Sequence, residues 1–85
     1  MNGDVQDLLS RLPADEHYLL VPLLKDGPKL AERLTGSRPH RSKLHRQATK
    51  GQRGIVLRCA SDGGTRLTCA AWLVEFWLKL GRRQP

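Results

Sequence analysis

Long apolar runs are absent from this sequence of 85 residues. The two longest, residues 18–24 with Pro22 inside and residues 70–74, fall well short of the roughly 20 apolar residues that a membrane-spanning helix needs. The N-terminus, Met1-Asn2-Gly3-Asp4, lacks the basic start and the small-residue cleavage site of a secretory signal. The sequence therefore predicts no membrane span, and we expect a cytoplasmic location.

Cysteine is also scarce. The chain has Cys59 and Cys69, which is few for a secreted domain that depends on disulfides, so we expect both to be reduced and half-buried. With His40 and His45 they could suggest a metal site, but the spacings match no zinc pattern. The sequence thus indicates no metal and no cofactor.

Little in the sequence suggests catalysis. It has no glycine-rich phosphate loop, and neither cysteine has the neighbours that activate a nucleophile. Asp15 and Glu16 form an adjacent acidic pair, which is more typical of a helix start or a solvated loop. We therefore expect no catalytic residues, no enzyme activity and no small-molecule substrate.

Acidic residues are missing between Glu32 and Asp62, and residues 33–61 are called the acid-free segment below. The segment carries eight positive charges, while the net charge of the chain is +7, so all other residues together sum to −1. These cations are Arg33, Arg38, Arg41, Lys43, Arg46, Lys50, Arg53 and Arg58. One contiguous stretch therefore holds the whole excess of charge.

Such a stretch is typical of a protein with a polyphosphate partner, because Lys and Arg displace the counterions of nucleic acids. A solvated basic face that keeps a small protein soluble is the alternative. A membrane surface is a weaker one, because the segment lacks the apolar face that an interfacial helix needs.

The few aromatic residues help to separate kinds of nucleic acid. Tyr18, Trp72, Phe76 and Trp77 all lie outside the acid-free segment. Proteins that bind single strands use exposed rings on which bases stack. The sequence therefore favours double-stranded nucleic acid as the partner.

Two elements are predicted before the acid-free segment. A helix over residues 4–12 is capped by Asp4 and stopped by Pro13. Its apolar residues share one helix face, which packs on the domain or faces a partner protein: Val5, Leu8, Leu9 and Leu12. Residues 18–23 then favour a short extended lead-in, because Pro22 does not suit a central strand.

A helix–turn–helix follows. The first helix covers residues 27–34, with Asp26 as its N-cap, Pro28 in its first turn and Gly36 at its end. After a turn over residues 35–39, Ser42 caps a helix over residues 43–50, which Gly51 closes. Leu44 and Ala48 face inward on this helix, and five polar residues face outward: Lys43, His45, Arg46, Gln47 and Lys50.

The C-terminal part predicts a hairpin and a last helix. The strands cover residues 55–59 and 66–69, around Gly63-Gly64. The apolar residues of the two strands share one face only if residues directly opposite each other have numbers that sum to an even value. These apolar residues are Ile55, Leu57 and Cys59 on the first strand and Leu67 and Cys69 on the second. A two-residue loop gives an odd sum, so we expect an odd-length connection or a bulge. Thr68 then caps a helix whose apolar stripe is Leu73, Phe76, Trp77 and Leu80, widened by Ala70, Trp72 and Val74.

This order predicts an α+β fold, mainly α, of the winged helix-turn-helix type with one β-hairpin wing. Residues 1–15 form an N-terminal amphipathic helix or appendage, residues 16–81 the winged domain and residues 82–85 a basic tail. With 39% hydrophobic residues the chain can form one small core.

Several short motifs in this order carry a family resemblance. They are Ser42-Lys-Leu-His-Arg46, Ala48-Thr-Lys-Gly51, Gly54-Ile-Val-Leu57, Gly63-Gly-Thr-Arg66, Thr68 and Phe76. Over about residues 19–80 the chain resembles the excisionase-like branch of the MerR-type winged-helix superfamily, and within it short bacterial proteins with the pattern S/T-x-L-Y-R-W-A-x-x-G. It departs from that pattern at His45, which replaces an aromatic residue, and at Gln47, which replaces the tryptophan. The resemblance implies DNA binding for regulation or site-specific recombination, without catalysis.

We expect the second helix of the pair to lie in the major groove of double-stranded DNA and the hairpin on the backbone. Lys43, Arg46 and Lys50 are predicted to contact phosphates and the groove, with His45 and Gln47 as candidate base readers. The remaining candidates are Arg41, Ser42 and Arg53 beside the helix, and Arg58 and Arg66 on the outer face of the wing.

Other partners stay open at this point. A second copy of the chain or a recombinase could act beside it on DNA. An RNA- or ribosome-associated basic module is an alternative function. A protein-interaction accessory factor, using the Val5 to Leu12 stripe or the Trp72 to Trp77 helix, is another.

Overall fold

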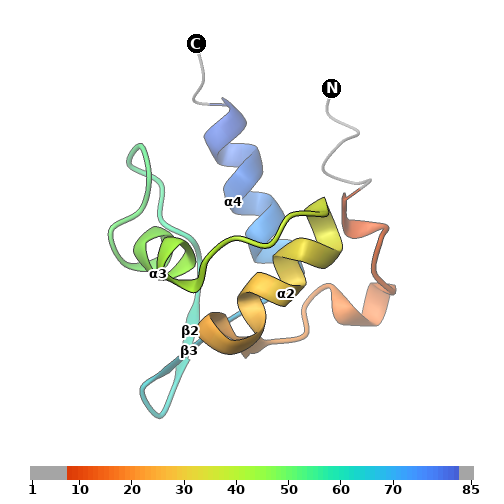
Figure 1. Ribbon diagram of the computed structural model, residues 1–85, viewed down its shortest axis with the longest axis horizontal. Helices are drawn as coiled ribbons and strands as arrows, with labels where there is room; N and C mark the ends of the chain where they lie inside the picture. Colours follow the sequence, from red (N-terminus) through yellow and green to blue (C-terminus); the bar gives the residue numbers. More distant parts are fainter. Residues whose placement is uncertain (1–7, 83–85) are drawn as a thin grey trace.

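The computed structural model describes residues 8–82, with the backbone alone for residue 82. Within them the elements are the 3-10 helix η1 (Ala14–Glu16), β1 (Val21–Pro22), α2 (Leu23–Thr35), α3 (Arg41–Thr49), β2 (Ala60–Asp62), β3 (Thr65–Thr68) and α4 (Ala70–Arg82) (Figure 1). The predicted α+β, mainly helical fold with a hairpin is confirmed. No helix in residues 8–82 is long and apolar enough to cross a membrane.

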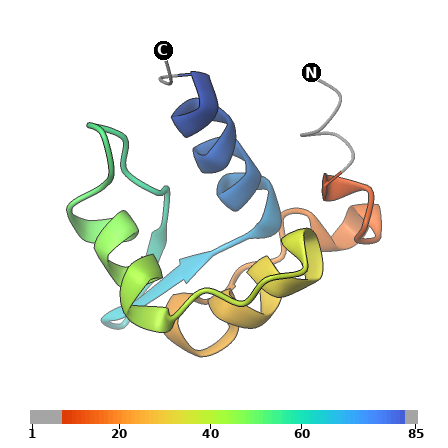
Figure 2. The ribbon, with the colours of Figure 1, turned by 45° about the horizontal axis from the view of Figure 1, so that its top comes forward.

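The core lies where α2, α3 and α4 meet, beside the small sheet (Figure 2). Leu73, Val74 and Phe76 of α4 are buried, with Trp77 and Leu80 packed against them, so the predicted stripe of the last helix is confirmed. Leu44 and Ala48 face inward from α3 as predicted. The buried set is completed by Leu12, Leu23, Leu30, Leu34, Leu57 and Ala70.

Leu8, Leu9 and Leu12 of the N-terminal stripe also pack on this core. Residues 8 and 9 are helical, and the chain turns at residues 10 and 11. Val5 and Asp4, and hence the first part of the predicted helix, lie outside the described residues. Over residues 8–12 the stripe therefore docks on the domain.

The α2 helix begins at Leu23, four residues before the predicted start. Pro22 occupies its N-cap position, and Asp26 lies inside the first turn, so the prediction that Asp26 is the N-cap is wrong. Leu23 is fully buried, and its burial favours helical structure on the N-terminal side of Gly27 and Pro28. Gly36 ends the helix in the left-handed conformation (φ 87°), as predicted.

The α3 helix begins at Arg41 and its N-cap is His40, so the prediction that Ser42 caps it is wrong. Nδ1 of His40 accepts a hydrogen bond of 3.1 Å from the Ser42 N–H, and it lies 2.8 Å from the Ser42 Oγ. The imidazole thus replaces the hydroxyl that commonly caps a helix. At the other end Gly51 (φ 80°) closes α3, as predicted.

The hairpin differs most from the prediction. Residues 55–59 form no strand, and β2 pairs with β3 in the register Ala60↔Leu67, Ser61↔Arg66 and Asp62↔Thr65. Opposed numbers therefore sum to an odd value, and Gly63-Gly64 is a two-residue loop with positive φ (58° and 87°), which suits the twist of a hairpin. The predicted odd-length connection or bulge is wrong, because the prediction assumed a strand over residues 55–59.

Residues 51–59 instead form a loop, the 51–59 loop. Arg53 (φ 55°) and Gly54 (φ 81°) turn the chain between Gln52 and Ile55, which pair as an isolated bridge. Leu57 is buried, and its N–H donates to the main-chain oxygen of Gln47 at 2.9 Å. Residues 55–59 therefore alternate between less and more exposed side chains, as a strand would, but they belong to an anchored loop.

On the other side of β3 lies β1, so the sheet order is β1-β3-β2 and all pairs are antiparallel. Val21 pairs with Thr68 and Pro22 with Leu67. Pro22 thus lies on an edge strand, where its missing N–H is tolerated. The predicted extended lead-in is confirmed at Val21 and Pro22, whereas Tyr18 lies in a turn and Leu23 already begins α2.

Candidate nucleic-acid interface

The outward side of α3 is almost entirely basic or polar. Leu44, Gln47 and Ala48 are its buried residues. The exposed ones include most of the predicted contacts: Arg41, Ser42, Lys43, His45, Arg46 and Lys50. In Figure 2, α3 lies at the edge of the molecule next to the 51–59 loop, so this side faces away from the core.

Gln47 does not face outward, so that prediction is wrong. Its exposed fraction is 6%, and its Nε2 donates to Oε1 of Gln52 at 3.1 Å. The corresponding position in the resembled pattern is a tryptophan, a residue that favours burial on the inner side of a helix. Gln47 therefore links α3 to the 51–59 loop, and its side chain does not present an edge to a base.

Three cations of the acid-free segment form ion pairs with carboxylates from other elements. Arg33 lies 3.1 Å from Glu16, Arg38 2.7 Å from Glu32 and Arg58 3.7 Å from Glu75. All three arginine side chains are more than half exposed, so each pair contributes at most about 1 kcal/mol to stability. Their larger effect is to neutralise the two ends of the segment.

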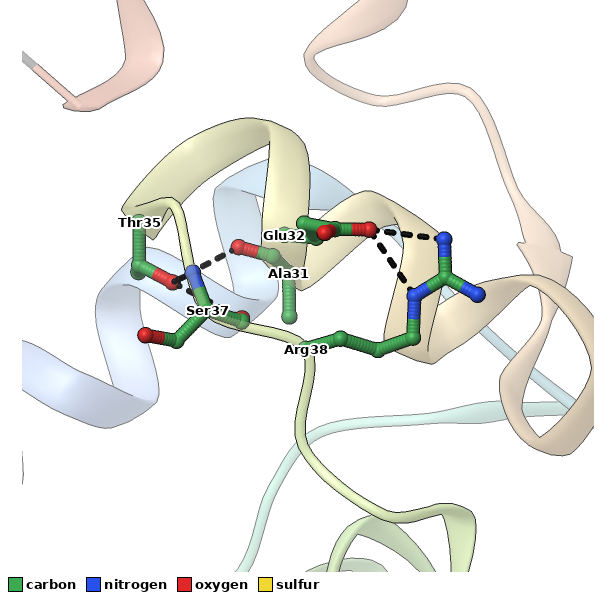
Figure 3. A network of polar contacts seen from close by, with 5 residues as sticks. All are labelled: Ala31, Glu32, Thr35, Ser37 and Arg38. Atoms are coloured by element: carbon green, nitrogen blue, oxygen red, sulfur yellow. Dashed lines mark hydrogen bonds and ion pairs between the residues drawn. The ribbon is translucent and has the colours of Figure 1, made fainter.

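The Arg38–Glu32 pair belongs to a network that holds the turn between α2 and α3 (Figure 3). The Arg38 Nε donates to Glu32 Oε1 at 2.8 Å. Thr35 Oγ1 donates to the Ala31 carbonyl at 2.9 Å and accepts from the Ser37 N–H at 3.2 Å. The first part of the turn, through Ser37 and Arg38, is therefore held against the C-terminal part of α2.

The other five cations of the segment form no ion pair within the described part of the chain. We call them the free basic face: Arg41, Lys43, Arg46, Lys50 and Arg53. Four belong to α3 or its C-cap, and Arg53 follows in the 51–59 loop. The excess charge of the sequence thus concentrates on one helix and the loop beside it.

A hollow joins α3 to the hairpin. His45, Thr65 and Arg66 line it together with Pro22, Leu24, Lys25 and Gly64. The structure therefore brings the predicted residues His45 and Arg66 to one place and adds Lys25. Sequence reasoning missed Lys25 because it placed the start of α2 two residues after this lysine.

Arg58 lies in the 51–59 loop and on neither strand of the hairpin, so the prediction that it lies on the wing is wrong. It contacts α4 through Glu75, and its guanidinium lies 6.0 Å from the centre of the Trp72 ring. On the hairpin itself, Arg66 and the exposed Asp62 have opposite charges. The hairpin therefore has no net charge, in contrast to α3.

Both cysteines are free. Burial raises the pKa of the Cys59 thiol, although Arg66 and Thr68 lower it in part. Burial also raises the pKa of Cys69, opposed by hydrogen bonds from the backbone of Trp72 and Ala71. Both thiols are therefore protonated near neutral pH, and a protonated thiol is a poor nucleophile.

No protein-family model, curated protein or solved structure matches this chain. The fold and the free basic face describe a small α+β domain with one strongly basic helix. The choice of function therefore depends on geometry and charge.

Proposed function

We propose that this protein binds double-stranded DNA, with α3 in the major groove and the β2–β3 hairpin against the sugar–phosphate backbone. The observation that carries the proposal is the free basic face, five cations without a carboxylate partner in the described residues. The resemblance to excisionase-like winged helices supports a regulator or an architectural factor, acting in the cytoplasm without catalysis.

The size of α3 suits this role. An α-helix with its side chains is about 10–12 Å across, and the major groove is roughly 12 Å wide, so the groove admits α3. The exposed side of the helix has no carboxylate that would repel phosphates. Arg41, Lys43, Arg46 and Lys50 are assigned to phosphate and groove contacts.

His45 is the remaining candidate base reader, since Gln47 is buried. Arg66 and Lys25 border the same hollow as His45 and are assigned to the backbone of the flanking strand. Arg58 is left out of the primary contacts because Glu75 pairs with it.

Duplex is favoured over single strands by the placement of the rings. Phe76 is buried, and Trp72 and Trp77 are half-buried on α4. Tyr18 is 72% exposed, but it lies outside α3 and the hairpin. The free basic face thus lacks the stacking platforms that single-strand binding uses.

The experiment that tests the proposal is a salt titration of the full chain with a fluorescein-labelled random DNA duplex, followed by anisotropy. The five cations of the free basic face predict that log K falls with log salt with a slope of about −4 to −5, and the backbone contacts of Lys25 and Arg66 make this slope steeper. A flat response, or no binding at low salt, contradicts the proposal. Competition with an unlabelled RNA duplex of the same sequence follows, and preference for RNA would favour the RNA-associated alternative.

A further inference from the structure

A cleft lies between the C-terminal half of α4 and the inner side of α3, beside the turn that joins α2 to α3. Its walls come from α2, this turn, α3, α4 and Gln52 of the 51–59 loop. The cavity volume is about 460 Å³, within the roughly 300–1,000 Å³ of small-molecule sites. Unlike the hollow beside the hairpin, this cleft contains an indole ring.

One wall is apolar and partly open. Trp77 and Leu80 of α4 are half-buried, and the buried side chains of Ala31 and Leu44 complete the apolar lining. The parts of the Trp77 indole and of Leu80 that stay exposed leave some apolar surface in water, which a planar apolar body can cover. This wall favours an aromatic ligand.

The rest of the lining is polar and, in the described part of the chain, contains no acidic residue. Lys43 is part of it and has no ion pair in the described residues. Gln47 and Gln52 bond to each other through one Nε2 and one Oε1. The Gln52 Nε2 has no hydrogen bond to the described protein, so it can donate to a bound group.

We propose that this cleft binds a small aromatic carboxylate, with its ring on Trp77 and Leu80 and its carboxylate at Lys43 and Gln52. Charge complementarity selects the anion, because Lys43 is an unpaired cation of the described lining, whereas Glu32 already pairs with Arg38. The compound is bound and released unchanged, so it is a ligand and not a substrate.

The ligand would also act on DNA binding, a step that rests on the proposed function. Lys43 belongs to both the cleft and the free basic face, and Leu44 and Gln47 are inner residues of α3. A carboxylate on Lys43 removes one cation from those available to phosphates. By linkage, ligand and DNA then weaken each other's binding by the same factor.

The test of the site uses 2-naphthoate and NMR of the full chain in the absence of DNA. The two tryptophans supply an internal control, since Trp77 lines the cleft and Trp72 lies against Arg58. We expect the indole N–H signal of Trp77 to shift saturably while that of Trp72 stays in place. Equal shifts of both signals, or none, would overturn the site.

Variants then test the polar part of the lining. Lys43→Gln should weaken 2-naphthoate binding about tenfold, the loss expected for one hydrogen bond to a charged group. Gln52→Glu keeps an acceptor for Gln47 but adds a like charge, and should weaken binding at least as much. Lys29→Gln, an exposed change outside the cleft, is the matched control and should bind normally. Equal affinity for uncharged naphthalene-2-carboxamide would overturn the assignment of an anion.

The coupling is tested by measuring duplex affinity with saturating 2-naphthoate and with equimolar acetate, which matches the ionic strength. We expect about tenfold weaker binding with 2-naphthoate, equal to the loss expected for one charged contact. Unchanged affinity would refute the coupling. A chain that binds 2-naphthoate at Trp77 but binds no duplex in either buffer would refute the proposed function and leave the ligand site standing.

Discussion

The ends and the middle of the acid-free segment use the same residue types in different ways. At the ends, Arg33, Arg38 and Arg58 each lie beside a glutamate from another part of the fold. In the middle, over residues 41–53, no cation has such a partner within the described chain. A uniform basic stretch in the sequence thus becomes one charged patch between two neutralised ends.

The difference teaches that counting charges along a sequence locates a polyanion site only coarsely. The acidic residues that neutralise the ends lie outside the segment, in η1, α2 and α4. Exposed pairs of this kind hold little folding energy, but they decide which cations remain available to a ligand.

The largest effect is expected when cations of the free basic face are neutralised. Arg46→Gln with Lys50→Gln should weaken duplex binding about 100-fold, since each lost charged contact is worth about tenfold. The slope of log K against log salt should become shallower by about 2. Anisotropy titrations at several salt concentrations measure both.

The matched control is Arg33→Gln with Arg58→Gln, which lowers the net charge by the same amount. It should weaken binding by less than about threefold, because glutamates already neutralise both arginines. Equal losses in the two double variants would mean that net charge alone matters and that the division of the segment into paired ends and a free middle is wrong.

The next effect is a loss of stability at Gly51, where α3 ends and the 51–59 loop begins. A Cβ on Gly51 would lie 2.5 Å from the Ile55 oxygen, and its φ is 80°. Gly51→Ala should therefore lower the free energy of unfolding by about 2 kcal/mol or more, from left-handed strain together with the clash. Urea denaturation measures the loss.

Gly54→Ala is its control, because φ is similar (81°) and the space around the added methyl is open. It should cost about 1 kcal/mol, from the left-handed conformation alone. If the two variants lose the same stability, the close approach of Gly51 to Ile55 does not anchor the loop.

A smaller effect follows from converting a paired cation into a free one. Glu32→Gln removes the carboxylate from Arg38, which lies just before α3. Duplex affinity should rise about threefold at low salt, with a steeper salt dependence, because one more cation can meet phosphate. Glu75→Gln, which releases Arg58 beside α4, should raise affinity less, and the reverse order would contradict the placement of the interface on α3.

How far the sequence could predict the fold depends on how local each signal is. The stripe of α4 and the inward pair Leu44 and Ala48 follow from helical spacing, and both are confirmed. The start of α2 was missed because Pro22, a strand residue in the sequence pattern, also serves as the helix N-cap. Burial of Leu23 in the core extends the helix toward its N-terminus, and rules that use only neighbouring residues in the sequence cannot predict this tertiary contact.

Residues 55–59 show a sharper limit. Alternating apolar and polar residues predict a strand, but a loop anchored by Leu57 and by its bond to Gln47 gives the same alternation. Because the predicted strand covers residues 55–59, the predicted hairpin pairs residues whose numbers sum to an even value, whereas the observed sums are odd. For the candidate site, the sequence predicted the basic helix but could not predict the pairs with Glu16, Glu32 and Glu75, which depend on tertiary contacts.

The smallest predicted effect tests whether the hairpin approaches DNA at all. Asp62 is exposed near the Gly63-Gly64 loop and cancels the charge of Arg66 on the same hairpin. Asp62→Asn keeps a residue suited to the turn and should raise duplex affinity about twofold, since it removes repulsion between one carboxylate and the backbone. Asp15→Asn, an equal charge change in η1, should leave affinity within error. If both variants gain equally, the hairpin lies away from the duplex, and DNA binding then rests on α3 and the 51–59 loop alone.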